Sequence, residues 1–556
     1  MNSARPRPLE RSAFGALIAL LLAPVIAQGL WRPTAHLFGT TASSAHVTLA
    51  SLLVAGSVTV AAWLRPDAPS RAMLAGGVTA VLSAAALTTG SAGLVALLGV
   101  AAVLGSVAPR MASRLPGTMD GLLARHPRWS VAYVFSALVA MVSVARVSVF
   151  MGDPSRVDMQ ALPGERFVET HSCLTAYVRA AALARQRVDN LYADPWWYGS
   201  LGLPPRPTGS APLYPPFELD NFSYPPPFLL LTSPLAPLEG DFLAQRALWF
   251  GLNGLLLALG LWVVARWIDG RGAHRALLLA PLFFGSVPVL VTLQIGNFHL
   301  ASVVLAVLAM VAFDVGRCAT GGAMLAATIL SKVSPGVLGV MMLARRRFRD
   351  AAYAAGFGAL LVAVSALVSG TEPLKSFVRF ALPRLSSGAA FPFMATETGL
   401  ITNIGPFGIP FKLRRLGFDV GDPWHVAPWC ARAYTLALVA LAFYGARHAH
   451  NRRDRAVTWL ALLSLAALQS PFSPGYATLG LLWATTLLAA EVRSVRSGLA
   501  LAVPWFVVVF APPGLSTEFR LLVSLAQTAV VVGGCAWLVA RAPRDVGDVD
   551  RLSHTT

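Results

Sequence analysis

Long apolar runs recur along the whole chain and are separated by short polar breaks. A helix needs about 20 apolar residues to cross about 30 Å of hydrocarbon, and the runs here are about 16 to 23 residues long. The pattern therefore predicts an all-α, polytopic integral membrane protein with about 14 transmembrane helices. The predicted helices are Phe14–Trp31, Ala45–Leu64, Met73–Thr89, Ala92–Val107, Ser130–Met151, Phe242–Ala265, Leu277–Leu293, Phe298–Val315, Ala352–Val368, Cys430–Gly445, Val457–Leu468, Tyr476–Ala490, Leu499–Phe510 and Leu521–Val539.

Two apolar pieces do not fit this series and predict short or re-entrant helical segments. Pro225–Leu238 is short and begins with prolines, and Gly321–Leu343 is interrupted by Lys332 and Pro335. Two half-helices of about 12 residues meeting at Lys332 would return both ends to one side. All short-loop arginine clusters, and both termini, then lie in the cytoplasm, as the positive-inside rule requires.

This topology predicts that four polar segments meet on the outer side of the membrane. They are the outer loops 152–223 and 370–428, and the turns 294–297 and 470–475. We divide the chain into a four-helix membrane module at 1–128, a membrane core at 129–490, and C-terminal helices with a cytoplasmic tail at 491–556. Within the first outer loop, apolar residues at helical spacing between Phe167 and Val188 predict an amphipathic helix on the membrane surface.

Composition agrees with the lipid bilayer as the main partner of this chain. Of the 556 residues, 56% are hydrophobic and 13% are charged, with a mean hydropathy of +0.62, which excludes a soluble multidomain enzyme. The net charge of +18 would suit a nucleic acid, but the arginines lie in the breaks between apolar runs, so no nucleic-acid partner is expected. The four cysteines lack a CxxC pattern, and no metal or cofactor is expected.

Several residues of the outer segments could bind a substrate. Lys332 lies between apolar half-helices, where a charge costs about 2.5 to 3.5 kcal/mol, so it should face a cavity or an anion unless it reaches the interface at a helix end. Gln294, Asn297 and His299 form either a polar turn or a group that binds hydroxyls or phosphate. A phosphate clamp or an anchor to anionic lipids is predicted for the basic residues of the second outer loop, which include Lys375, Arg379 and Arg384.

Acid–base chemistry would need a carboxylate from the first outer loop. The candidate catalytic residues are Glu169, Asp158 and Asp220. No Gly-rich dinucleotide loop, P-loop or HExxH motif occurs. A soluble nucleotide substrate is therefore disfavoured, and a lipid-linked substrate fits better.

Five short motifs in order resemble family 87 of the type C membrane glycosyltransferases, between about Ser130 and Ala490. They are Asn190-Leu191-Tyr192, Tyr224-Pro225-Pro226-Pro227-Phe228, the turn 294–297, Leu330-Ser331-Lys332-Val333-Ser334-Pro335 with the arginines at 345–349, and Ser470-Pro471. The resemblance implies a hexosyltransferase that moves mannose from a polyprenyl phosphate to a glycan or glycolipid acceptor, on the outer side of a bacterial inner membrane. It also implies that Lys332 and the basic loop hold the donor phosphate, while Tyr224, Gln294 and Asn297 line the sugar site.

One position departs from the family pattern. The family usually has an aspartate, the expected base, about four residues before the tyrosine that opens the loop helix, and here Cys173 precedes Tyr177. Either another carboxylate replaces it or the transferase activity is lost or altered. A transporter or flippase of lipid-linked sugars and a catalytically silent membrane scaffold are therefore retained as alternatives.

Overall fold

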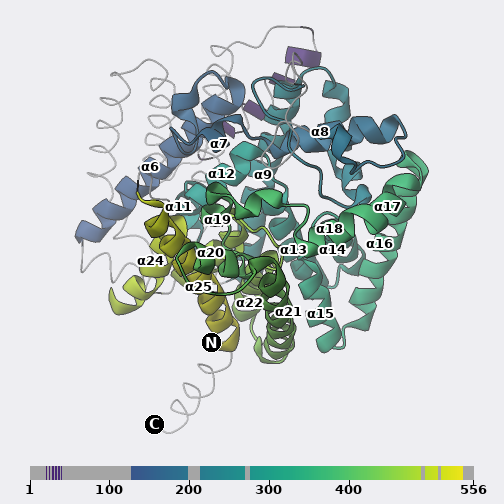
Figure 1. Cartoon of the computed structure of the whole chain (residues 1–556). Helices are drawn as coiled ribbons and strands as arrows, with labels where there is room; N and C mark the ends of the chain where they lie inside the picture. The colour runs from purple at the N-terminus through teal and green to yellow at the C-terminus, as the bar shows by residue number, and fades with distance from the viewer. Residues whose placement is uncertain are drawn as a thin grey trace, which may run out of the picture.

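The computed structural model describes residues 127–197, 213–269, 276–489, 492, 495–510 and 515–541, with isolated positions between 21 and 39. In this part of the chain the regular elements are helices, accompanied by two isolated β-bridges (Figure 1). The all-α prediction is confirmed for these residues.

Four described helices are long and apolar enough to cross a membrane: α9 (Phe242–Ile268), α16 (Phe348–Ser369), α21 (Pro423–His448) and α25 (Thr517–Arg541). A fifth crossing results if α12 (Val287–Ile295) and α13 (His299–Asp314), which are bent by 108°, count as one broken span. Only 6% of the apolar window of α16 is buried inside the protein, and one side of the helix packs on α14 while its other side is exposed.

The predicted count of 14 crossings is not confirmed. Ala45–Leu64, Met73–Thr89 and Ala92–Val107 lie outside the described residues, and Phe14–Trp31 is described only at isolated positions. Several other predicted spans are short helices. The remaining elements are α6 (Pro127–Gly152), η2 (Val157–Met159), α7 (Arg166–Thr170), α8 (Cys173–Arg185), η3 (Asp194–Trp196), η4 (Pro226–Leu238), η5 (Leu277–Leu279), α11 (Ala280–Phe284), α14 (Cys318–Ile329), α15 (Gly336–Ala344), α22 (Arg452–Ala467), η9 (Gly475–Thr478), α23 (Leu479–Ala489) and α24 (Val495–Val509).

Two predicted boundaries are wrong. The span Leu277–Leu293 is divided into η5, α11 and α12, with a break at Gly285, where a Cβ atom would lie 2.4 Å from the Cβ of Ala140 on α6. The second outer loop ends earlier than predicted, because α21 begins at Pro423 with the Asp422 carboxylate accepting the Trp424 N–H. Short helices also occupy much of this loop: α17 (Glu372–Ser376), η6 (Phe377–Ala381), α18 (Leu382–Ser387), η7 (Pro392–Ala395), α19 (Glu397–Thr402), η8 (Pro406–Gly408) and α20 (Ile409–Arg415).

The interrupted piece around Lys332 forms a helical hairpin, as its sequence predicts. Arg347, just after α15, lies 2.7 Å from Asp314, just before α14, so both ends of the α14–α15 hairpin meet at one end of the molecule. The helices stop at Ile329 and restart after Pro335, since proline lacks the N–H that a continuous helix would need. The hairpin therefore presents Lys332 at its closed tip.

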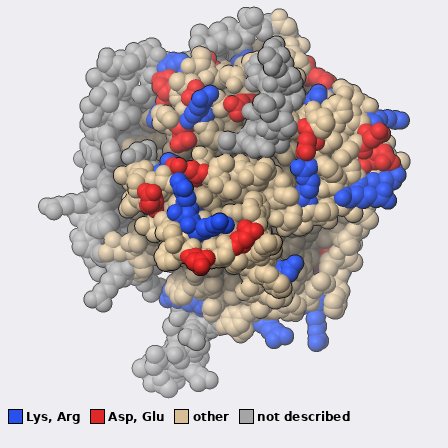
Figure 2. All heavy atoms as spheres, viewed as in Figure 1, with Lys and Arg blue, Asp and Glu red and all other residues tan. Residues whose placement is uncertain are grey.

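An arginine-rich network closes the open end of this hairpin. Asp314, whose side chain is 4% exposed, accepts a hydrogen bond from Arg347 at 2.7 Å and forms an ion pair with Arg455 at 2.6 Å. Arg345 donates to the Ala446 carbonyl at 2.6 Å. In Figure 1, α15 and the ends of α21 lie at the bottom, opposite α7, α8 and α12 at the top. Most of the described surface in the same view is uncharged, and the charged side chains form separate groups (Figure 2).

Removing the central carboxylate of this network should destabilise the protein. In Asp314→Asn, the partly buried Arg455 loses its counter-ion and Arg347 keeps only Asp350. Removing one partner of a buried ion pair costs about 3 kcal/mol. We expect a thermal unfolding temperature several degrees lower in lipid nanodiscs. Glu372→Gln, which breaks the half-exposed pair with Lys375, is the matched control and should leave the unfolding temperature nearly unchanged. If Asp314→Asn and Glu372→Gln unfold at the same temperature, Asp314 does not stabilise the protein through this network.

At the opposite end, the polar segments predicted to meet do contact one another. Gln294 binds the first outer loop, with its side-chain oxygen accepting the Ala161 N–H at 2.6 Å. Asn403 of the second outer loop donates to the Pro471 carbonyl at 2.8 Å, and Arg384 lies 3.0 Å from Asp194. These contacts enclose a second hydrophobic cluster, built on α8, η4 and the start of α13, beside which the polar groups gather.

Candidate functional site

The start of α8 is joined to the segment before η4, and this junction positions Asp220. The Glu218 N–H donates to the Thr170 carbonyl at 2.9 Å, as part of a parallel bridge between His171 and Glu218. The Asp220 N–H donates to the Thr175 hydroxyl at 2.9 Å, and that hydroxyl donates to the Ser172 carbonyl at 2.7 Å. Asp220 thus lies beside the residues that precede and open α8.

His171, Cys173 and Asp220 form a compact group, which we call the polar triad. The Cys173 sulfur lies 3.4 Å from the His171 Nε2, and the Asp220 Oδ2 lies 3.6 Å from the same nitrogen. All three ligand-type atoms fall within 4.8 Å of one another. Burial and, secondarily, the negative charge of Asp220 raise the pKa of the Cys173 thiol well above its usual range, so the free thiol is protonated near neutral pH.

The turn between α12 and α13 adds an amide to this group. The Asn297 Nδ2 donates to the Cys173 sulfur at 3.3 Å, and its Oδ1 accepts the His299 N–H at 3.0 Å. Gly296 has φ +71°, a left-handed conformation that glycine adopts without a Cβ penalty, and the Trp249 Nε1 donates to its carbonyl at 2.8 Å. The turn is therefore held in one conformation that directs Asn297 to the triad.

Gln294 of the same turn has a different environment. Its side-chain oxygen accepts the Ala161 N–H at 2.6 Å, its nitrogen donates to the Val168 carbonyl at 2.8 Å, and the residue is fully buried. Both ends of the amide are engaged by the backbone of the first outer loop. Gln294 therefore joins α12 to the first outer loop.

Two tyrosines form one wall of the site. The Tyr177 and Tyr224 hydroxyls lie 2.8 Å apart, and the Tyr177 hydroxyl accepts the Phe298 N–H at 3.2 Å. Burial raises the pKa of the Tyr224 phenol well above its usual range, so it remains a neutral hydrogen-bonding group. The segment predicted as one amphipathic helix on the membrane surface forms two helices, α7 and α8, and the face of α8 that carries Tyr177 is buried within the protein.

The hairpin tip brings a cation to the same place. The Lys332 Nζ lies 5.2 Å from the centre of the Tyr224 ring and 5.1 Å from that of Tyr476, both within cation–π range. The His299 ring lies 5.2 Å from the Tyr476 ring at a tilted angle of 39°, and its buried Nε2 has no hydrogen-bond partner among the described residues. An unpartnered buried nitrogen is a place where a ligand could bind.

The structure does not bring every predicted residue into this group. Asp158 is exposed and pairs with Arg156 at 3.3 Å, and no described contact joins Glu169 to the triad. The predicted basic residues Lys375, Arg379 and Arg384 lie on α17, η6 and α18, and α17 and α18 lie toward the right of Figure 1. Among these basic residues, Lys375 pairs with Glu372, Arg384 pairs with Asp194, and Arg379 is exposed.

Four site residues are absent from the predicted set: His171, Cys173, Tyr177 and Tyr476. Cys173 occupies the position where the family aspartate is expected, and His171 lies two residues before it, so that departure is the signal that could have identified them. Tyr476 directly follows the predicted turn 470–475. Nothing in its local sequence distinguishes it from a residue of the aromatic belt.

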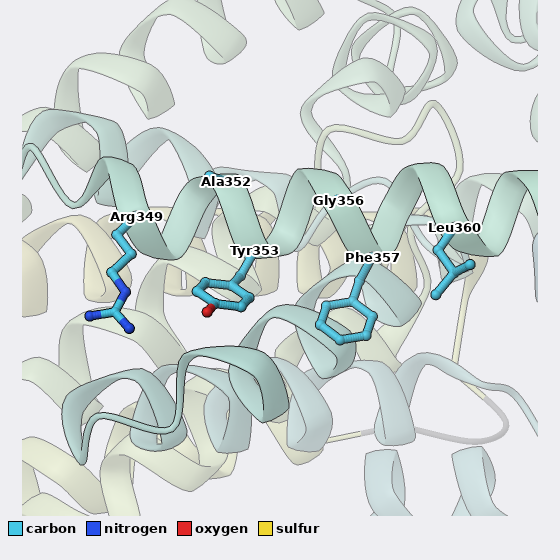
Figure 3. A pocket seen from close by; sticks show the side chains of 6 residues that line it. All are labelled: Arg349, Ala352, Tyr353, Gly356, Phe357 and Leu360. Carbon is cyan, nitrogen blue, oxygen red and sulfur yellow. The ribbon is translucent and has the colours of Figure 1, made fainter.

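A separate apolar groove lies on α16, away from the polar triad. It is lined by Arg349, Ala352, Tyr353, Gly356, Phe357 and Leu360 (Figure 3). All six belong to one lipid-facing helix, and the only charged group is Arg349. The residues that line this groove include no acid–base pair.

The apolar helices and the buried polar group together define a helical membrane protein with a site suited to acid–base and phosphate chemistry. Residues 222–474 match the family model of Glycosyltransferase family 87. The match supports membership of that family, confirms the resemblance seen in the motifs, and implies a glycosyltransferase. Tyr224, Asn297, His299 and Lys332 lie within the matched range, whereas the polar triad precedes it. No curated protein and no solved structure matches the chain.

Proposed function

We propose that the chain transfers a hexose, by family resemblance mannose, from a polyprenyl-phosphate donor to a glycan or glycolipid acceptor. The reaction takes place on the outer side of a bacterial inner membrane, with both termini in the cytoplasm. The observation that carries the proposal is that the Lys332 amine lies 5.2 Å from the Tyr224 ring, and the Tyr224 hydroxyl lies 2.8 Å from that of Tyr177, one turn of α8 beyond the Cys173 of the polar triad. The Asp220 carboxylate and the Lys332 amine therefore belong to one site although they come from distant segments of the chain. A proton acceptor and a phosphate-binding cation are the two groups that such a transfer needs.

The proposed step is a single displacement with inversion. An acceptor hydroxyl oxygen attacks the anomeric carbon of the donor, and the bond from that carbon to the phosphate oxygen breaks. Polyprenyl phosphate leaves with the bonding electron pair, and the hydroxyl proton passes to the Asp220 carboxylate. Among the three predicted carboxylates, only Asp220 has a described contact with His171 and so belongs to the polar triad.

The other groups have distinct roles in this step. Lys332 compensates the charge that develops on the leaving phosphate, and the positive end of the α13 dipole, which begins at His299, acts in the same direction. The free Nε2 of His299 and the hydroxyl of Tyr224 bind hydroxyl groups of the sugar. Tyr224 and Tyr476 hold the amine between them, which keeps it directed toward the donor site.

Reconstitution with defined donors tests this function. The purified protein in liposomes should transfer label from polyprenyl-phosphate mannose to membrane glycolipid, and not from a nucleotide mannose. A label that crosses the bilayer still attached to polyprenyl phosphate would favour the transporter alternative. If no label moves at all, while a related enzyme works under the same conditions, the scaffold alternative gains and the proposal fails.

The hydroxyl that positions Asp220 should contribute measurably to the rate. Thr175→Val keeps the shape of the side chain but removes the acceptor of the Asp220 N–H, so we expect transfer to fall about tenfold with a stability loss of about 1 kcal/mol. Thr232→Val removes a buried hydroxyl that donates to Leu229 on η4, and is the matched control. An equal loss of rate in both variants would contradict a positioning role for Thr175.

A further inference from the structure

The polar triad has the composition of a metal-binding site as well as of an acid–base site. An imidazole nitrogen, a thiol sulfur and a carboxylate oxygen are the three ligand types that zinc uses in proteins. They come from two segments, the junction of α7 with α8 and the strand-like stretch before η4. Neither segment alone has a spacing that indicates a metal.

The distances within the triad agree with tetrahedral coordination. Zinc binds sulfur at about 2.3 Å and nitrogen or oxygen at about 2.0 to 2.2 Å, which places neighbouring ligand atoms about 3.4 to 3.6 Å apart. Here the sulfur-to-nitrogen distance is 3.4 Å and the nitrogen-to-oxygen distance is 3.6 Å. All three atoms lie within 4.8 Å, so a small rotation of the Asp220 side chain would complete the face of a tetrahedron.

The surroundings suit a thiolate ligand. The Asn297 amide donates to the Cys173 sulfur at 3.3 Å, and such a hydrogen bond stabilises a metal-bound thiolate and holds its orientation. Coordination would release the thiol proton to water. A divalent ion would then be balanced by one thiolate and one carboxylate, leaving the nearby Lys332 amine beside a site with no net charge.

We propose that His171, Cys173 and Asp220 bind a zinc ion or a similar thiophilic divalent cation. Three protein ligands leave one position of a tetrahedral ion open, as in catalytic zinc sites, and this position can take an oxygen of the substrate. The ion would then lower the pKa of an acceptor hydroxyl at the place where the family has an aspartate, and the Asp220 oxygen that does not bind the ion would take the hydroxyl proton. The ion's role in transfer rests on the proposed function, but its binding does not.

Metal content and cobalt spectroscopy test the site directly. The purified full-length protein, dialysed against buffered zinc, should retain about one zinc per chain. Replacement by cobalt(II) should produce a thiolate-to-cobalt charge-transfer band. Cys173→Ser should lose this band, and His171→Gln should weaken cobalt binding at least tenfold. Cys535→Ser, a buried cysteine on α25, and His425→Gln, an exposed histidine, are the matched controls and should behave as wild type.

A further variant distinguishes loss of the thiolate ligand from loss of folding. Cys173→Asp should still bind one metal ion, without the thiolate band, and with a preference displaced from zinc toward manganese, because a carboxylate is a harder ligand than a thiolate. Wild-type protein without stoichiometric zinc, or a thiolate band that persists in Cys173→Ser, would overturn the site.

The ion's role and the proposed function can fail separately. Full-rate transfer by zinc-free protein would overturn the role of the ion and leave the transferase proposal intact. Bound zinc in a protein that transfers no hexose under any donor condition would support the metal site and overturn the function.

Discussion

Asp220→Asn should reduce hexose transfer by about 10²- to 10⁴-fold, which is the contribution of a general base to a transfer rate. The amide keeps the size of the side chain and can still accept the Asn221 N–H, so the local fold should be retained. It cannot accept the proton of the acceptor hydroxyl. The measurement is the single-turnover rate with labelled polyprenyl-phosphate mannose, together with the thermal unfolding temperature.

The other two candidate carboxylates provide the comparison. Asp158→Asn and Glu169→Gln should transfer at rates within about twofold of wild type, since surface substitutions away from a site have small effects. A large loss in Glu169→Gln together with normal transfer in Asp220→Asn would show that the base is Glu169. In that case the geometry of the polar triad would not describe the reacting complex.

Lys332→Met should lower transfer by about 10²- to 10³-fold, the usual effect of removing one group that stabilises a developing negative charge. Methionine fills the space between the Tyr224 and Tyr476 rings without a charge. The amine lies where its hydration is reduced, at a cost of about 2.5 to 3.5 kcal/mol for a charge deep in a membrane. The variant should therefore be at least as stable as wild type while it is far less active.

Opposite changes in stability and activity distinguish a functional lysine from a structural one. Binding of polyprenyl phosphate, measured by calorimetry in nanodiscs, should weaken in parallel with the rate. Lys375→Met is the matched control, because that amine is half exposed and already paired with Glu372. If Lys332→Met destabilises the protein and leaves donor binding unchanged, then Lys332 is a snorkelling residue.

Much of the helical architecture follows from local composition. The α9 helix occupies Phe242–Ile268 where the apolar run predicts Phe242–Ala265, and α16 extends the predicted Ala352–Val368 by a few residues at its start. Apolar length is a reliable signal because lipid provides no partner for backbone polar groups, so long apolar runs must be helical. The predicted bounds of long spans agree better with the observed helices than those of short spans do.

Breaks within apolar runs were harder to predict. The division of Leu277–Leu293 depends on the close approach of Gly285 to α6, which no local pattern reveals. By contrast, the break at Lys332 is visible in the sequence, because a charge and a proline both disfavour a continuous buried helix. The first kind of break reflects packing between segments, and the second reflects the chemistry of the segment itself.

For the site, the sequence predicted the turn residues Asn297 and His299 and the amine of Lys332. In the structure Asn297 accepts the His299 N–H, and His299 and Lys332 both lie next to the Tyr476 ring. The sequence could not rank the three carboxylates, since each lies in the same polar loop with similar neighbours. The inclusion of Asp220 depends on its hydrogen bond to Thr175, which is 45 positions away in the chain.

By itself, the order of apolar, basic and proline residues determined that this is a helical membrane protein with an amine at the tip of a hairpin. These features follow from transfer free energies that act residue by residue along the chain. Only the tertiary structure decided that His171, Cys173 and Asp220 share one site and that Gln294 joins two segments. Such choices depend on directional hydrogen bonds between distant segments, and those form only after the helices have packed.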